Sequence, residues 1–210
     1  MKRLHILLGI QSLLAVFVSI NRLTDWFTGY VLPNEFLRWV DLNNVIVALI
    51  SMVAGYLLKK TLEYNSPSRE GPAHTAWNLV FIIGVFISAV SYGFHEMGNY
   101  LHFRFCLEDT TSDLCRIVIF NDDEFSHWLF FAGFIMVNAA ILFIQNIFPH
   151  RGEVKGGDVA LLLLNSLFLG LGVMANLGFE EIGLDLYIVA LLAIVSAFLL
   201  WKRGKQPMFI

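Results

Sequence analysis

The chain has 210 residues, of which 57% are hydrophobic and 15% are charged, and its formal net charge is −3 at pH 7. This composition lies outside the usual range of soluble domains. A negative net charge without a stripe of basic residues also argues against a surface that binds nucleic acid. The sequence therefore predicts an integral membrane protein whose first partner is the lipid bilayer.

Apolar runs approaching 20 residues recur along the chain, and a helix needs about 20 such residues to cross the hydrocarbon core of a bilayer. A transmembrane β-barrel would instead show alternating segments of about ten residues. We expect an all-α, polytopic protein with about six transmembrane helices in a single domain, residues 1–210. The predicted spans are Leu4–Ile20, Val45–Leu58, Trp77–Tyr100, Phe125–Phe148, Val159–Phe179 and Leu186–Trp201.

The distribution of charge predicts how the chain is oriented, because Lys and Arg accumulate in cytoplasmic loops. With the N-terminus in the cytoplasm, 10 of the 14 basic residues lie inside and 13 of the 17 acidic residues lie outside. Six spans then place the C-terminus in the cytoplasm as well. We expect a multi-pass protein of a bacterial inner membrane.

Two segments of the predicted outer side are expected to be ordered. Cys106 and Cys115 both lie between the third and fourth spans, where an oxidising compartment lets them pair. Closing so short a loop stabilises a fold by about 2–3 kcal/mol, and the alternative is two unpaired thiols. Residues 33–40 have apolar side chains at helical spacing, which indicates a short interfacial helix or, alternatively, an ordered loop.

The third predicted span ends in a polar stripe. Ser91, His95, Asn99 and His102 are spaced by three or four residues, so a helix places them on one face. Glu96 points to a neighbouring face. Ionisable residues at this depth are costly unless they are paired or face a cavity. The stripe is therefore a candidate site.

Two other span ends carry ionisable residues at the same predicted depth. Asp123 and His127 are four residues apart where the fourth span begins, and Glu180 and Glu181 follow the fifth span. Together with the stripe on the third span, these residues predict that three helix ends meet at the outer face.

Imidazole and carboxylate groups are ordinary ligands of zinc and iron, so this cluster suits a divalent metal. The preferred ligands are His95 and His127 with one of Asp123 or Glu181, and His102 is a further candidate. The spacing matches no fixed metal-binding motif.

A metal with an open coordination position activates water, and Glu96 or Glu180 is then the candidate catalytic base. This chemistry predicts a metal-dependent membrane enzyme, such as a hydrolase, that acts on a lipid or another apolar substrate at the outer leaflet. Axial ligation of heme by His95 and His127 is a less favoured possibility.

Other interpretations need no metal. Acidic residues before the fourth span favour its helix dipole, with Asn121 or Asp122 as the N-cap. The cluster is then either a metal-free proton or substrate site, or a set of hydrogen bonds that braces the helices. The corresponding functions are a small transporter, or an accessory or scaffold subunit that binds other membrane proteins.

The residues of this region also resemble those of a known family. The order His95-x-x-Gly98-Asn99, then Asn121-Asp122-x-x-x-Ser126-His127, then Phe179-Glu180-Glu181 is similar to the order in the YjdF-like bacterial inner-membrane proteins. The resemblance covers roughly residues 90–185. It implies a shared site rather than a reaction, because that family has no established activity.

A second resemblance concerns one helix. Ser91-x-x-x-His95 is similar to the serine–histidine pair of the membrane hydrolases in the alkaline ceramidase and adiponectin-receptor superfamily. This resemblance implies lipid hydrolysis. Those proteins usually have seven helices and a late pair of histidines, whereas no histidine follows His150 here.

Overall fold

The computed structural model describes residues 1–64, 71–177 and 184–210. Within these ranges the chain is helical, and its one extended contact is an isolated bridge between Tyr30 and Arg38. The α-helices are α1 (Lys2–Leu23), α2 (Trp39–Tyr64), α3 (Pro72–Leu101), α4 (Asp113–Ile119), α5 (Ser126–Ile147), α6 (Gly156–Leu177) and α7 (Leu184–Arg203). Two π-helical segments, η2 (His102–Cys106) and η3 (Phe120–Phe125), and two short 3-10 helices, η1 (Asp25–Phe27) and η5 (Pro207–Phe209), complete the described part.

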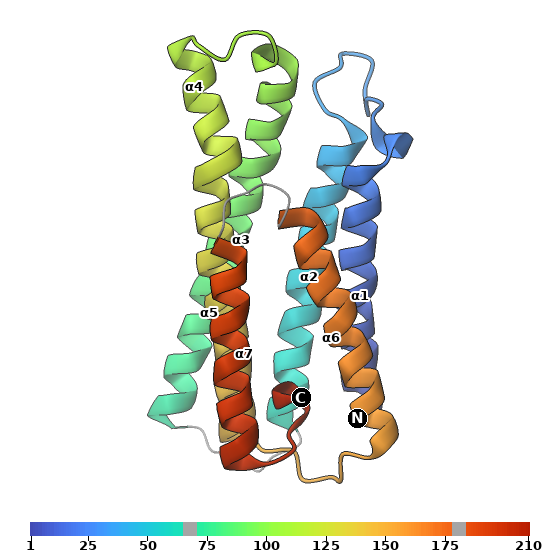
Figure 1. Cartoon of the computed structure of the whole chain (residues 1–210), viewed down its shortest axis with the longest axis vertical. Helices are drawn as coiled ribbons and strands as arrows, with labels where there is room; N and C mark the ends of the chain where they lie inside the picture. Colours follow the sequence, from blue (N-terminus) through green and yellow to red (C-terminus); the bar gives the residue numbers. More distant parts are fainter. Residues whose placement is uncertain (65–70, 178–183) are drawn as a thin grey trace.

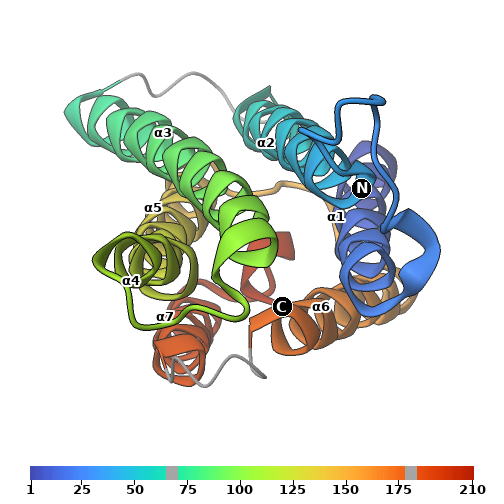
Figure 2. The ribbon, with the colours of Figure 1, turned by 90° about the horizontal axis from the view of Figure 1, so that it is seen from above.

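Six helical stretches of the described residues are long and apolar enough to cross a membrane, which confirms the predicted all-α class and agrees with the six predicted apolar segments. The helices run side by side along the long axis, and both termini lie at the same end (Figure 1). Seen from above, α1, α2, α3, α5, α7 and α6 follow one another around the bundle (Figure 2).

The third and fourth spans are longer than the others. Pro72–Cys106 and Asp113–Ile147 each have 35 residues, because η2 continues α3 and because α4, η3 and α5 form one continuous stretch. At about 1.5 Å per residue such a stretch exceeds a hydrocarbon core of about 30 Å. These two spans extend beyond the other helices at one end of the molecule (Figure 1).

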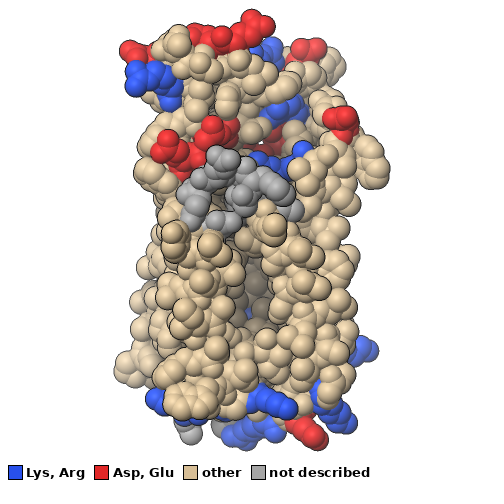
Figure 3. Space-filling view, viewed as in Figure 1, with Lys and Arg blue, Asp and Glu red and all other residues tan. Residues whose placement is uncertain are grey.

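Charge separates along the same axis. On the face shown in Figure 3, most acidic side chains lie at the end where α3 and α4 project, basic side chains predominate at the end that holds the termini, and the belt between them shows few charged side chains. We call these the acidic end and the basic end. The separation matches the predicted pattern of outer and inner loops.

Glycines allow the closest helix pair, α3 and α5, to approach. A Cβ atom added to Gly133 would lie 2.3 Å from Ser88 Oγ and 2.8 Å from the backbone oxygen of Gly84. Small residues at such crossings are typical of membrane helix packing, which depends on van der Waals contact. This pair carries the projecting part of the bundle.

Burial differs between the two ends. Near the basic end the buried core is apolar and includes Leu4, Leu58, Ile144 and Phe148. Toward the acidic end the buried side chains are largely polar or charged: Asn21, Arg38, Asp41, Asn44, Ser91, Glu96, Asp122, Ser126 and His127. The polar residues of the sequence therefore form a second, hydrogen-bonded core.

The predicted interfacial helix at residues 33–40 is wrong, and the alternative of an ordered loop is confirmed. The loop is fixed by backbone hydrogen bonds of 2.8 Å from Val31 to Leu37 and 2.9 Å from Trp39 to Gly29. Glu35 adopts a left-handed conformation with φ of 59°. The apolar side chains of this segment follow a turn and not a helix face.

Candidate functional site

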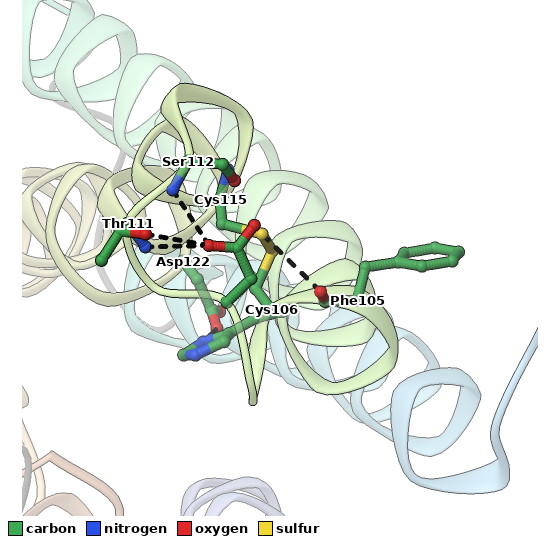
Figure 4. The surroundings of a disulfide bond; sticks show 8 residues. Phe105, Cys106, Thr111, Ser112, Cys115 and Asp122 are labelled. Atoms are coloured by element: carbon green, nitrogen blue, oxygen red, sulfur yellow. Dashed lines mark hydrogen bonds and ion pairs between the residues drawn. A yellow bond between two sulfur atoms is a disulfide. The ribbon is translucent and has the colours of Figure 1, made fainter.

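The loop above the site is closed by a disulfide bond between Cys106 and Cys115, as predicted. Ser112 caps α4 by accepting a hydrogen bond from the backbone nitrogen of Cys115 at 3.3 Å. Hydrogen bonds from Ser112 and Thr111 hold the pKa of Asp109 below its usual range. These contacts tie the ends of η2 and α4 together beside Asp122 (Figure 4).

The fourth span begins earlier than the sequence indicated. Its first helical residue is Asp113 and its N-cap is Ser112, so the prediction that Asn121 or Asp122 caps this helix is wrong. The residues at 120–125 instead form the π-helical turn η3. A π turn shifts the register of side chains, and such turns are frequent at functional sites.

The two π segments bring three candidate ligands together. His102 begins η2, and Asp122 and Asp123 lie in η3. One ligand atom from each of these residues lies within 4.8 Å of the others. His102 Nδ1 and Asp122 Oδ2 are 3.1 Å apart and form a hydrogen bond. We call these three residues the His-Asp-Asp cluster.

Burial distinguishes the two aspartates of this cluster. Asp122 is 2% exposed, whereas Asp123 is exposed. Asp122 Oδ2 contacts His102, but Asp122 Oδ1 has no hydrogen-bond partner among the residues that the structure describes. A buried carboxylate oxygen without a partner is costly and marks a position where an ion or a donor belongs.

Gly98 permits the approach of α3 to η3. A Cβ atom at this position would lie 3.1 Å from both Cα and Cβ of Asp122 and 3.2 Å from its backbone nitrogen. Any larger residue would press against Asp122. The glycine therefore sets the depth at which the Asp122 carboxylate lies.

His95 and His127 lie beside the cluster rather than within it. Their rings meet edge to face, with centroids 5.2 Å apart. His95 Nδ1 is 3.0 Å from Glu96 Oε1, and His127 Nδ1 is 2.7 Å from the backbone oxygen of Asp123. The structure thus brings four predicted residues together: His95, Glu96, His127 and Asp123. The group whose spacing suits a metal also includes Asp122, which the sequence had indicated only as a helix cap.

Two predicted residues, Glu180 and Glu181, lie outside the described residues. Their roles as base and ligand stay predictions. The predicted base on the third span, Glu96, is described: it is 7% exposed, and its Oε2 accepts a hydrogen bond from Asn44 Nδ2 at 3.0 Å. Both of its oxygens therefore have partners, His95 and Asn44.

The sequence analysis missed the contribution of the first two helices. Arg38 donates two hydrogen bonds to Asp41, at 2.7 and 2.8 Å, and a third of 2.7 Å to Asn99 Oδ1. Asn44 Oδ1 accepts from Asn21 Nδ2 at 2.8 Å. The signal was present, because Arg38, Asp41 and Asn44 are each three residues apart and therefore lie on one helix face.

These contacts form a network across the acidic end. It runs from Asn21 on α1 through Asn44 on α2 to Glu96 and His95 on α3. The network then reaches α5 through the ring contact of His95 and His127. A network that satisfies its members in this way fixes the relative positions of four helices.

The donor set of the His-Asp-Asp cluster fits a divalent metal. A tetrahedral zinc ion has ligands at about 2.0–2.2 Å, so its ligand atoms lie about 3.4 Å from one another. The ligand atoms of the cluster lie within 4.8 Å of one another, and a bound ion would replace the 3.1 Å hydrogen bond between His102 Nδ1 and Asp122 Oδ2. One imidazole and two carboxylates also leave a coordination position open, as in catalytic sites.

Comparisons of the chain with models of protein families, with curated proteins and with solved structures gave no match. The resemblances to the YjdF-like proteins and to the ceramidase superfamily stay predictions. The Ser91 hydroxyl, which carried part of the second resemblance, is buried and donates a 2.8 Å hydrogen bond to the backbone oxygen of Ser126.

Proposed function

We propose that this chain is a metal-dependent membrane enzyme of the hydrolase class, with zinc or iron held by His102, Asp122 and Asp123. Its substrate is a lipid or another apolar molecule of the outer leaflet, and both termini lie in the cytoplasm. The observation that carries the proposal is the buried Asp122, whose Oδ1 lacks a partner among the described residues beside an imidazole and a second carboxylate.

The position of the cluster supports access to both water and lipid. It lies on the two spans that project past the other helices, at the acidic end. The same two spans also carry exposed apolar side chains within ten residues of the cluster along the chain: Phe94, Met97, Phe103, Phe105, Phe120 and Trp128. A surface of this kind holds an amphiphile with its polar group toward the cluster.

The metal and the neighbouring side chains would have different roles in the reaction. A divalent metal in this position would lower the pKa of a bound water and polarise a substrate carbonyl or phosphoryl oxygen. His95 and Glu96 form a hydrogen-bonded pair that accepts and holds a proton, and Asn44 fixes the Glu96 carboxylate from the opposite side. The contact with His127 orients the His95 ring.

A lipid-turnover assay tests this function. The purified protein is incubated with a mixed extract of phospholipids and sphingolipids, and mass spectrometry follows the products with added zinc or iron. We expect turnover that a chelator abolishes and that Asp122→Asn lowers by at least a hundredfold. Asp113→Asn is the control, because Asp113 is an exposed carboxylate at the same end. A metal-loaded wild-type protein that turns over no lipid would contradict the proposal.

One observation favours a second candidate, an accessory subunit that braces a larger membrane complex. Arg38 donates hydrogen bonds to both Asp41 and Asn99. These bonds connect α3 to the start of α2 and need no catalytic role to explain them. This alternative predicts that the chain copurifies with other membrane proteins after mild solubilisation. It also predicts that Asp122→Asn leaves that association intact.

A further inference from the structure

A second feature lies away from the His-Asp-Asp cluster, between α2 and α3 near the basic end. The two helices diverge toward that end (Figure 2). A groove of about 570 Å³ separates them there, within the range of pockets that hold small ligands. Its lining residues are Met52, Val53, Tyr56, Lys59, Lys60, Asn78, Phe81, Ile82 and Val85.

The walls of this groove are largely apolar, and several of their side chains are exposed on the outside of the bundle. Val53 is 50% exposed and Ile82 is 61% exposed, and both lie inside helices that are long and apolar enough to cross a membrane. From Met52 to Lys60 the α2 wall extends about 12 Å along the helix axis. The groove therefore offers an apolar wall long enough to lie along part of an acyl chain.

Basic residues stand at the end of the groove nearest the basic end of the molecule. Lys59 Nζ lies 2.6 Å from Glu63 Oε1, and Lys60 Nζ lies 3.1 Å from Glu63 Oε2. His74 Nε2 also contacts Glu63, at 2.9 Å. Among the described residues here, two lysines thus share one carboxylate, so the site has an excess of positive charge.

The two lysines differ in exposure. The side chain of Lys59 is 6% exposed and packs over the ring of Phe81, whereas that of Lys60 is 50% exposed and lies over Tyr56. Lys60 can therefore meet a ligand from the membrane surface while Lys59 supports it from within. Basic side chains at this depth attract anionic lipid headgroups.

We propose that the groove is a binding site for one anionic phospholipid of the leaflet at the basic end. One acyl chain lies between Val53 on α2 and Ile82 on α3, and the headgroup phosphate lies against Lys60. This site is independent of the proposed metal centre. A zwitterionic lipid can place its acyl chain in the same groove, but it gains less binding free energy from the excess positive charge.

The test uses the intact protein reconstituted in vesicles of equal parts phosphatidylglycerol and phosphatidylcholine, extracted in mild detergent. Native mass spectrometry then counts the lipids that stay bound. We expect about one phosphatidylglycerol per chain, and Lys60→Gln should lower its preference over phosphatidylcholine about fivefold. Val53→Phe fills the groove and should remove both lipids.

Two matched controls make the result specific. Lys202 lies over the ring of Phe198 on α7, much as Lys60 lies over Tyr56, but it lines no part of this groove. Val189 is a comparably exposed valine on the same helix. Lys202→Gln and Val189→Phe should leave lipid retention unchanged. Equal retention of both lipids by the wild-type protein, or equal losses in the control variants, would mean an adventitious annular lipid only and would overturn the proposal.

Discussion

At the acidic end of the bundle a buried arginine has a single acidic partner, whereas at the basic end a buried lysine belongs to a shared cluster. Arg38 is 6% exposed and binds Asp41 through two hydrogen bonds. Lys59 is 5% exposed and binds Glu63, which also contacts Lys60 and His74. The buried Asp41 carboxylate therefore depends on one basic partner, whereas Glu63 keeps two other partners when one is lost.

This difference is consistent with the functions that we propose for the two ends. Buried charges without substitutes are costly to disturb, and they hold side chains in one geometry, as a metal or catalytic site requires. Long lysine side chains beside a membrane surface can move toward water, so they tolerate change and suit a lipid headgroup. The comparison predicts that substitutions of similar chemistry have unequal effects at the two ends.

The largest effect is expected for Arg38→Met. The substitution leaves the buried Asp41 carboxylate without its counter-charge, so the free energy of unfolding should fall by about 3–5 kcal/mol. Unfolding of the detergent-solubilised protein by denaturant measures the change. Arg116→Met is the control, because Arg116 and Asp113 are also three residues apart in the sequence but form an exposed pair, with nitrogen and oxygen 3.7 Å apart. Its effect should stay within about 0.5 kcal/mol.

Removing the disulfide tests the covalent support of the acidic end. The variant with Cys106→Ala and Cys115→Ala should lose about 2–3 kcal/mol, because the cross-link no longer restricts the unfolded chain. Reductant should lower the thermal stability of the wild-type protein and leave the double variant unchanged. If full reduction of the disulfide left the thermal stability of the wild-type protein unchanged, the bond would not contribute to the stability of this loop.

Gly98→Ala should cost about 1–2 kcal/mol, because its Cβ would press on the backbone of Asp122 at 3.1–3.2 Å. It should also weaken metal binding about tenfold or more by displacing the Asp122 carboxylate. Titration calorimetry with zinc measures the second effect. Gly93→Ala on the same helix has open space for its Cβ and should retain full metal affinity. Equal affinities in the two variants would contradict the role given to Gly98.

The smallest effect is expected for Lys59→Met at the basic end. Glu63 keeps its contacts with Lys60 and His74, and methionine retains most of the packing against Phe81. The free energy of unfolding should therefore change by less than about 1 kcal/mol. The denaturant assay used for Arg38→Met applies here. A loss as large as that of Arg38→Met would remove the proposed contrast between the two ends.

The fold could be predicted from the sequence because apolar runs of membrane length leave few alternatives. The six long apolar helices and the pairing of Cys106 with Cys115 are confirmed. The boundaries of the fourth span could not be predicted, because η3 interrupts the 3.6-residue period and lets the helix continue back to Asp113. An acidic run normally read as a helix start is here part of a helix interior.

The candidate site was predicted in part. His95, Glu96 and His127 were expected near one another and are in contact or adjacent. The choice of Asp122 over Asp123 as the buried carboxylate depends on the π register, which no periodicity in the sequence reveals. Arg38 could have been included, because its spacing from Asp41 and Asn44 gave the necessary signal.

The central claim is that His102, Asp122 and Asp123 hold a divalent metal, and elemental analysis of the purified protein tests it most directly. The protein is extracted in detergent without chelator, and bound zinc and iron are counted per chain. We predict about one metal ion in the wild-type protein and in Asp113→Asn, and less than about a tenth of that in the variant with His102→Gln and Asp122→Asn. A folded wild-type protein that holds no metal after incubation with zinc or iron, or a double variant that keeps it, would contradict the account.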